Sequence, residues 1–167
     1  MDFKIHTTTI YNCSLERAFK APILGDVTKV HTGYGLMPAV TKTTNDESWG
    51  KVGSIKNIYA AKSLTFKGGE VSTDEVIERI ENKYWKVEVG NFKSWMLNIW
   101  KFTFEWTTTE IEPKKIKINY DYTIHGKGVL LIPFQWLFAN VFYKRYMKQV
   151  LENVRKMAEG NEPFQYE

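Results

Sequence analysis

The sequence predicts an α+β protein in which a curved antiparallel sheet of seven strands is covered by one long C-terminal helix, with two short helices after the first strand. Three observations predict this arrangement. Two segments in the second half alternate between apolar and polar residues, a helical apolar stripe follows them, and turn residues separate shorter strand-like segments before them. At 167 residues the chain has a usual single-domain length. We therefore expect one domain over 1–160 and a loose C-terminal tail over 161–167.

The N-terminal segment is expected to form the first strand. Residues 3–11 are rich in β-branched and aromatic side chains that suit a strand. A short helix is expected over 15–20 after the N-cap residue Ser14, and Pro22 should interrupt it because proline lacks a backbone N–H. A second short helix is expected over 23–32.

Six more strands are expected after the short helices, because clusters of turn-forming residues separate the strand-like segments. Their expected ranges are 38–45, 51–61, 69–81, 83–91, 96–110 and 114–125. Such closely spaced strands are typical of an antiparallel meander. Together with the first strand they make a sheet of seven.

The last two strands alternate most clearly, since successive side chains on a strand point to opposite faces. In the first of them the shared face carries Asn98, Trp100, Phe102, Phe104 and Trp106. In the second it carries Ile116, Ile118, Tyr120, Tyr122 and Ile124. The opposite faces are polar, so we expect one face of the sheet to be wet and the other to be covered.

A helix over 133–159 is expected to provide that cover, with Pro133 at its first position and Gly160 at its end. Its residues at alternating spacings of four and three form one stripe. The stripe is Trp136, Asn140, Tyr143, Met147, Val150, Val154 and Met157. We interpret it as the side of the helix that faces the sheet.

This order of elements resembles the SRPBCC or START-like helix-grip superfamily, which has the fold of the birch pollen allergen and includes a polyketide cyclase/dehydrase-like branch. The cues are 14–19 after the first strand, 49–54 before the third strand, and 70–80 in the fourth. The resemblance implies a cavity between sheet and helix that binds a hydrophobic small molecule such as a lipid, sterol, polyketide or aromatic compound. Some members of the superfamily catalyse cyclisation in that cavity, so a cyclase or dehydratase acting on an apolar substrate is the alternative.

The expected ligand-binding residues combine the inward rows of the two alternating strands with the helical stripe, because aromatic walls with a few polar groups are typical of ligand pockets. They are Asn98, Trp100, Phe102, Phe104, Trp106, Ile118, Tyr120, Tyr122, Trp136 and Tyr143. The competing interpretation is a solid aromatic core. Glu75 and Arg79, four apart on one strand, form either a polar contact at the pocket or a surface ion pair.

A second apolar stripe lies at the start of the long helix. It consists of Phe134, Leu137, Phe138 and Val141. Three kinds of cover remain open for it: the region 23–37 of the same chain, a second subunit in a homodimer, or a membrane surface.

Other classes of function are disfavoured by composition. The net charge is +4, but lysines and arginines are not clustered as a nucleic-acid surface requires. The three histidines, His6, His31 and His125, are scattered, so no metal site is expected. No glycine-rich phosphate loop and no catalytic signature appear, so no cofactor is expected and enzymatic activity stays open. The single cysteine, Cys13, and an N-terminus without an export signal favour the cytoplasm.

Overall fold

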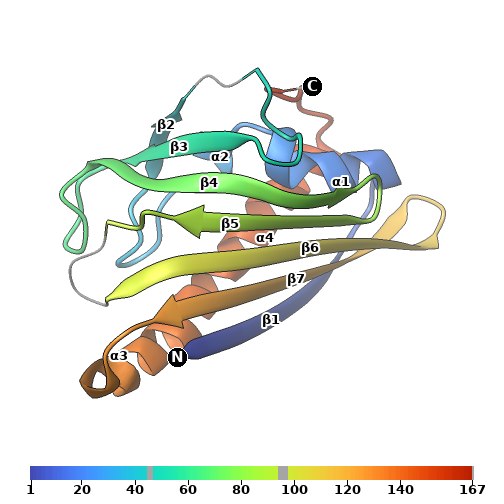
Figure 1. Cartoon of the computed structure of the whole chain (residues 1–167). Helices are drawn as coiled ribbons and strands as arrows, with labels where there is room; N and C mark the ends of the chain where they lie inside the picture. Colours follow the sequence, from blue (N-terminus) through green and yellow to red (C-terminus); the bar gives the residue numbers. More distant parts are fainter. Residues whose placement is uncertain (45–46, 94–97, 167) are drawn as a thin grey trace.

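The computed structural model in Figure 1 describes residues 1–44, 47–93 and 98–166. Seven strands form one antiparallel sheet, as expected, and their order in the sheet is β1-β7-β6-β5-β4-β3-β2. The strands are β1 (Asp2–Tyr11), β2 (Val40–Thr43), β3 (Ile55–Ala60), β4 (Gly69–Ile80), β5 (Tyr84–Gly90), β6 (Ile99–Glu112) and β7 (Lys115–Gly126). From β2 to β7, each strand pairs with the next one in the sequence and so forms a meander. β1 pairs with β7 at the other edge of this meander.

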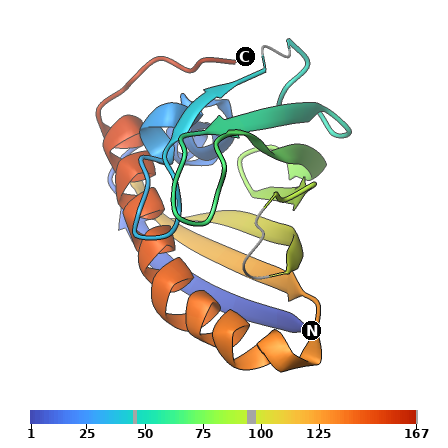
Figure 2. The same ribbon diagram turned by 90° about the vertical axis from the view of Figure 1, so that its left-hand side faces the viewer.

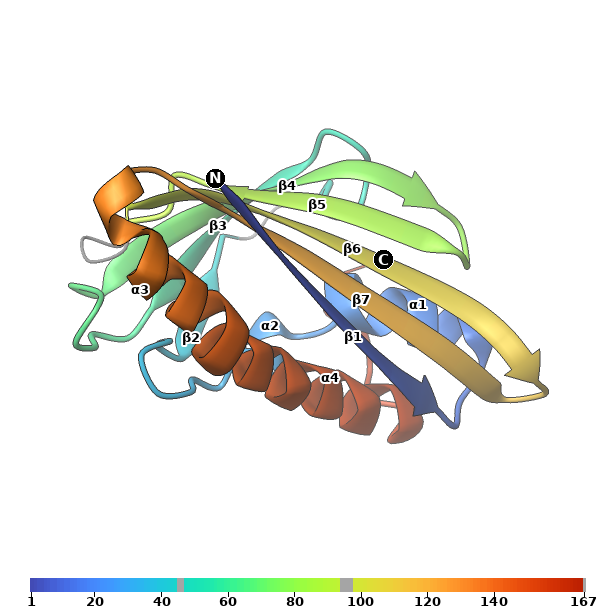
Figure 3. The same ribbon diagram turned by 90° about the horizontal axis from the view of Figure 1, so that it is seen from below.

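The helices lie on the concave side of this sheet (Figures 2 and 3). They are α1 (Leu15–Leu24), α2 (Val27–Val30), the single 3-10 turn η1 (Val129–Leu131), α3 (Ile132–Leu137), the π-helical η2 (Phe138–Tyr143) and α4 (Lys144–Glu159). The segments from η1 to α4 form the long C-terminal helix, whose end at Gly160 matches the prediction. The expected α+β helix-grip arrangement is confirmed.

The first short helix does not stop at Pro22, so that prediction is wrong. α1 continues to Leu24 although Pro22 has no N–H for the carbonyl of Ala18, four residues earlier. The indole nitrogen of Trp106 donates to that carbonyl at 3.2 Å. The indole of Trp85 donates to the next carbonyl, of Phe19, at 2.8 Å. Two tryptophans of the sheet thus supply the donors that allow the helix to pass through a proline.

The second short helix is only one turn long rather than spanning 23–32. Because α1 extends to Leu24, the chain turns at Gly25, and Asp26 begins α2 by accepting a hydrogen bond from the backbone N–H of Thr28 at 3.0 Å. The segment after Val30 leaves the helix and runs toward β2. This places His31 in a loop over the sheet.

The long helix contains a π-helical segment, which shifts its inward stripe by one residue. From Tyr143 onward the predicted stripe is buried: Tyr143, Met147, Val150, Val154 and Met157. Before it, Trp136 is 55% exposed, and Gln135 and Ala139 are buried instead of Trp136 and Asn140. A π-turn has an i→i+5 hydrogen bond and so adds a residue to the turn, which a regular 3.6-residue pattern does not anticipate.

The C-terminal tail is not loose over its described residues, which end at Tyr166. The backbone N–H groups of Gln165 and Tyr166 both donate to the carbonyl of Leu24, at 2.8 and 3.1 Å. The Tyr166 side chain is 7% exposed and its hydroxyl lies 3.1 Å from that of Thr43. The last residues therefore tie the end of α1 to β2.

Candidate ligand-binding cavity

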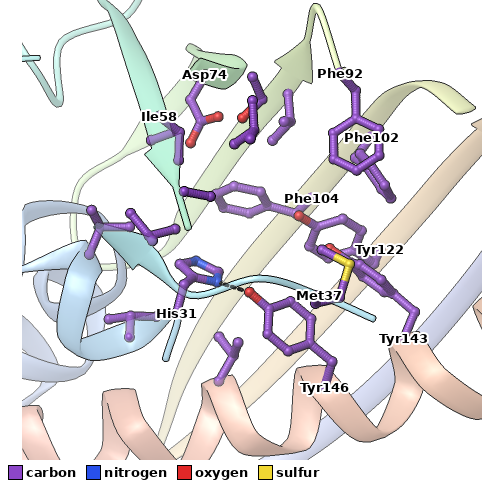
Figure 4. Close-up of a pocket in the computed structure, with 18 of the residues that line it drawn as sticks. His31, Met37, Ile58, Asp74, Phe92, Phe102, Phe104, Tyr122, Tyr143 and Tyr146 are labelled. Atoms are coloured by element: carbon purple, nitrogen blue, oxygen red, sulfur yellow. Dashed lines mark hydrogen bonds between the residues drawn. The ribbon is translucent and has the colours of Figure 1, made fainter. Parts of the chain in front are cut away.

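A partly enclosed cavity of about 100 Å³ lies between the concave face of the sheet and α4. Its walls come from α2 and the following loop, from strands β2 to β7, and from α4. Figure 4 shows how the aromatic rings of the sheet and of the helix approach one another there. This is the space in which the sequence predicted a ligand.

Six of the ten predicted ligand-binding residues line this cavity. They are Phe102, Phe104, Trp106, Tyr120, Tyr122 and Tyr143. Their contact with a ligand stays a prediction. The placement of the five strand residues in one wall follows from the alternation of β6 and β7, whereas Tyr143 comes from η2 of the long helix. Ile118 is fully buried in the core and is not among the residues that line the cavity.

The other three predicted residues, Asn98, Trp100 and Trp136, point away from the cavity. A bulge between Ile99 and Lys101 interrupts the pairing of β6 with β7. A bulge adds one residue to a strand and so reverses the facing of the residues on one side of it. Ile99 is buried in consequence, whereas Trp100 is 46% exposed. The inward facing predicted for Asn98 and Trp100 is therefore wrong, and the π-helical shift accounts for Trp136.

The hydroxyl groups of Tyr120, Tyr122 and Tyr143 are polar groups in the largely aromatic lining of the cavity. The ring of Tyr122 lies 4.9 Å from that of Tyr143 and 5.6 Å from that of Tyr120, measured between ring centroids. Burial raises the pKa of all three phenols. They are consequently neutral at physiological pH and act as hydrogen-bond donors and acceptors rather than as bases.

His31 is a cavity residue that the sequence analysis did not select. Its Nδ1 and the Tyr146 hydroxyl are 2.5 Å apart and share one hydrogen bond (Figure 4). Burial, with a smaller contribution from the charge of Lys56, lowers the pKa of His31 to about 4. The imidazole is therefore neutral, and together with Tyr146 it forms a polar corner in the apolar wall.

Asp74 is the only carboxylate among the described residues that line the cavity, and it too was not selected from the sequence. It lies on β4 opposite Lys56 of β3. Burial raises its pKa to about 6, against lowering effects of the Lys56 charge and of a hydrogen bond from Ser72. Its Oδ1 is buried and has no hydrogen-bond partner among the described residues. A buried carboxylate oxygen without a partner is costly, which makes this atom the most unusual feature of the cavity.

Lys56 points to the same face of the sheet as Asp74, because directly paired residues on neighbouring strands share a face. The Lys56 side chain is 2% exposed, and its ammonium lies 4.0 Å from the centroid of the Trp49 ring and 5.2 Å from that of Tyr166. Such cation–π contacts stabilise a desolvated ammonium. Lys56 is not among the residues that line the cavity.

Glu75 and Arg79 do not form the predicted pair. A bulge between Val76 and Glu78 puts the two residues on opposite faces of β4. Glu75 is exposed, whereas Arg79 stacks over the Trp85 ring at 4.6 Å and bonds to the carboxylate of Glu81 at 2.7 Å. Neither residue lines the cavity.

Only part of the apolar stripe at the start of the long helix is exposed to solvent. Phe138 is 4% exposed and packs in the core, which contradicts its assignment to an interaction patch. Val141 is half-buried. Phe134 and Leu137 are exposed, and they join the exposed Val129 and Leu130 of the preceding turn. We call these four residues, Phe134, Leu137, Val129 and Leu130, the end cluster.

A weak signal for the missed cavity residues is present in the sequence. Asp74 lies between Ser72 and Val76 in a period-two row, so strand alternation places it with the buried face. Nothing in the sequence distinguishes His31 from an exposed loop histidine.

Within the described residues, no group of three or more His, Cys, Asp or Glu side chains is arranged to hold a metal ion. In the same part of the chain, no helix is long and apolar enough to cross a membrane.

Comparison with solved structures identifies the fold. The structure of Ara h 8.0201 matches 96% of this chain and 100% of its own length, with a TM-score of 0.71 and 15% identity. A protein of unknown function, SA2116 from Staphylococcus aureus, matches 96% of each chain, with a TM-score of 0.71 and 13% identity. Norcoclaurine synthase from Thalictrum flavum, in complex with dopamine and hydroxybenzaldehyde, matches 98% of this chain and 90% of its own, with a TM-score of 0.66 and 10% identity. No family model and no curated protein sequence matches the chain.

These similarities show a helix-grip protein with the SRPBCC or birch-pollen-allergen type of fold, as the order of elements predicted. At 10 to 15% identity they establish the fold alone. Proteins of this fold include small-molecule binders and some enzymes. The function of this chain has to be argued from its own cavity.

Proposed function

We propose that this protein binds a small hydrophobic molecule in the cavity between sheet and α4, and that it carries or sequesters that molecule in the cytoplasm. The observation that supports the proposal is the aromatic wall formed by Phe102, Phe104 and Trp106, which faces a partly enclosed space rather than a filled core. Apolar burial contributes about 25 cal/mol per Å² to binding before ordering costs are subtracted. The His31–Tyr146 pair and Asp74 would then set the orientation of the ligand.

The size of the cavity favours a compact ligand. A dry apolar cavity of about 150 Å³ in another protein holds one benzene ring. The cavity here, at about 100 Å³, is of that order. A one-ring molecule fits this space as it stands, whereas a sterol requires the tyrosines and Met37 to move apart.

Binding explains the cavity more simply than catalysis does. General acid–base catalysis requires a titratable group within hydrogen-bond reach of the reacting atoms of a substrate. The imidazole of His31 already shares its Nδ1 with Tyr146, and the buried phenols are neutral, which leaves Asp74 as the one candidate among the described lining residues. Binding requires no reactive group and is therefore the simpler explanation.

Native mass spectrometry of the purified protein with a panel of neutral one-ring aromatics, fatty acids and sterols tests the proposal. We expect stoichiometric adducts with the small aromatics. Val89→Phe, which puts a ring into the cavity wall, should abolish them, whereas Val52→Phe, at an exposed site, should not. Absence of any adduct with the whole panel, from a protein shown to be folded by its melting curve, contradicts the proposal.

The end cluster supports a second, accompanying role, which is contact with an anionic lipid surface. Leu130 is 91% and Val129 80% exposed, which is costly for a surface that stays in water. The segment from Lys127 to Leu151 contains four lysines and arginines and no aspartate or glutamate. Exposed apolar side chains beside positive charge suit a membrane surface with anionic headgroups.

Sedimentation with vesicles tests this contact. The protein should pellet with vesicles of mixed phosphatidylserine and phosphatidylcholine and not with phosphatidylcholine alone. Leu130→Glu should abolish pelleting, and Val52→Glu, at an exposed site in the turn before β3, should leave it unchanged. If Leu130→Glu instead converts a dimer to a monomer in sedimentation equilibrium without any effect on vesicles, the end cluster is a homodimer contact and the membrane proposal is wrong.

A further inference from the structure

The carboxylate of Asp74 restricts the chemistry of the ligand, which the apolar wall of the cavity does not. Asp74 lines the cavity, and its Oδ1 is buried and accepts no hydrogen bond from any described residue. Folded proteins rarely leave such an oxygen without a partner. In Figure 4 the Asp74 side chain comes from the sheet, whereas the His31–Tyr146 pair comes from the loop and helix on the other side.

The groups around Asp74 do not supply the missing donor. Across the strand pairing, β5 presents the apolar Val89. On β3 the paired Lys56 points to the same face as Asp74, and its ammonium lies 4.0 Å from the centroid of the Trp49 ring. The other titratable groups that line the cavity are the hydroxyls of Tyr120 and Tyr122 on β7, Tyr143 on η2 and Tyr146 on α4, and the imidazole of His31 in the loop after α2. None of them donates to Oδ1.

We infer that the ligand of this cavity is a small apolar amine whose protonated nitrogen donates a hydrogen bond to Oδ1 of Asp74 while its hydrocarbon part lies against the aromatic wall. This inference rests on the proposed function. A carboxylate inside an apolar site accepts a charge-assisted bond from an ammonium, which is about twice as strong as a bond between neutral groups. The rings of Phe104 and Tyr122 add a favourable environment for a cation.

A neutral ligand that donates through a hydroxyl is the nearest alternative, and the charge of Asp74 decides against it. An ionised carboxylate in an apolar cavity is stabilised more by a cation than by a neutral donor. The charge of Lys56 gives partial compensation from beside the cavity, but Lys56 is not among the residues that line the cavity. In the complex, the ammonium of the ligand lies inside the cavity beside Asp74.

The test compares benzylamine with benzyl alcohol, two probes of nearly equal size that differ in charge. Calorimetric titration near pH 8 should show the amine binding about tenfold more tightly, the difference expected between charge-assisted and neutral hydrogen bonds. Asp74→Asn should remove this preference. The matched control is Glu75→Gln, the same change at the exposed neighbouring residue of β4, which should retain it.

The outcomes separate the inference from the proposed function. If both probes bind equally, the cavity binds ligands but the amine inference is wrong. If Asp74→Asn keeps the preference, or if neither probe binds, the inference is also wrong. In the last case the proposed function fails only if the neutral panel gives no adduct either. The preference should decline below about pH 6 as Asp74 takes up a proton, whereas His31, with its pKa near 4, stays neutral over that range.

Discussion

Asp74→Asn should stabilise the ligand-free protein at alkaline pH and have little effect in acid. Burial raises the pKa of Asp74 from 3.8 to about 6. Between these values the native protein binds the proton and the unfolded chain does not, so the free energy of unfolding falls as the pH rises. At about 1.4 kcal/mol per pKa unit, the ionised Asp74 costs roughly 3 kcal/mol above pH 6. An asparagine of the same shape carries no charge and avoids this cost.

His31 has the opposite effect on the wild-type protein over much of the same range. Its pKa is lowered from 6.5 to about 4, so there the unfolded chain binds the proton and stability rises with pH. The two contributions largely offset each other between pH 4 and 6. The wild-type protein should therefore show a flat pH profile, and Asp74→Asn should show a rising one.

Urea unfolding followed by tryptophan fluorescence at several pH values measures this difference. We expect Asp74→Asn and the wild type to have nearly equal unfolding free energies near pH 3.5 and to differ by roughly 2 to 3 kcal/mol near pH 8. Glu75→Gln should follow the wild type throughout. A difference that does not change with pH, or a wild type more stable than Asp74→Asn at pH 8, would refute the burial and ionisation assigned to Asp74.

Three further predictions concern packing. Tyr146→Phe should destabilise the protein by about 1 to 2 kcal/mol in urea melts, because it leaves Nδ1 of His31 without its partner; an unchanged midpoint would contradict that bond. Phe138→Glu should prevent folding, since Phe138 is buried, whereas Phe134→Glu should fold normally; circular dichroism distinguishes the two, and a folded Phe138→Glu would place that residue on the surface. Cys13, whose pKa burial raises to about 11, should resist iodoacetamide at pH 8 until urea unfolds the chain, and rapid alkylation of the native protein would show that the thiol is accessible.

The sequence predicts this fold well because its main elements follow regular periods. The alternation in β7 and the stripe from Tyr143 to Met157 hold throughout those segments, and both faces were assigned correctly. Prediction failed where the period is interrupted. The bulge next to Trp100, the bulge between Glu75 and Arg79, and the π-helical segment after Trp136 each change the phase by one residue.

The polar part of the cavity was harder to predict for a different reason. Asp74 and His31 are more than 40 residues apart in the sequence. They line the same cavity only because the folded chain brings β4 and the loop after α2 together. Their shifted pKa values depend on burial, which no local sequence pattern predicts. The helix through Pro22 likewise depends on distant donors, the indoles of Trp85 and Trp106.

The most direct test of the central claim is an NMR titration of the labelled protein with a neutral one-ring aromatic such as toluene. We expect saturable shifts of the ring protons of Phe104, Tyr122 and Tyr146, and none at the exposed Trp100 and Trp136. Shifts that do not saturate, or that are confined to the exposed tryptophans, would show that the space between sheet and α4 does not receive a ligand.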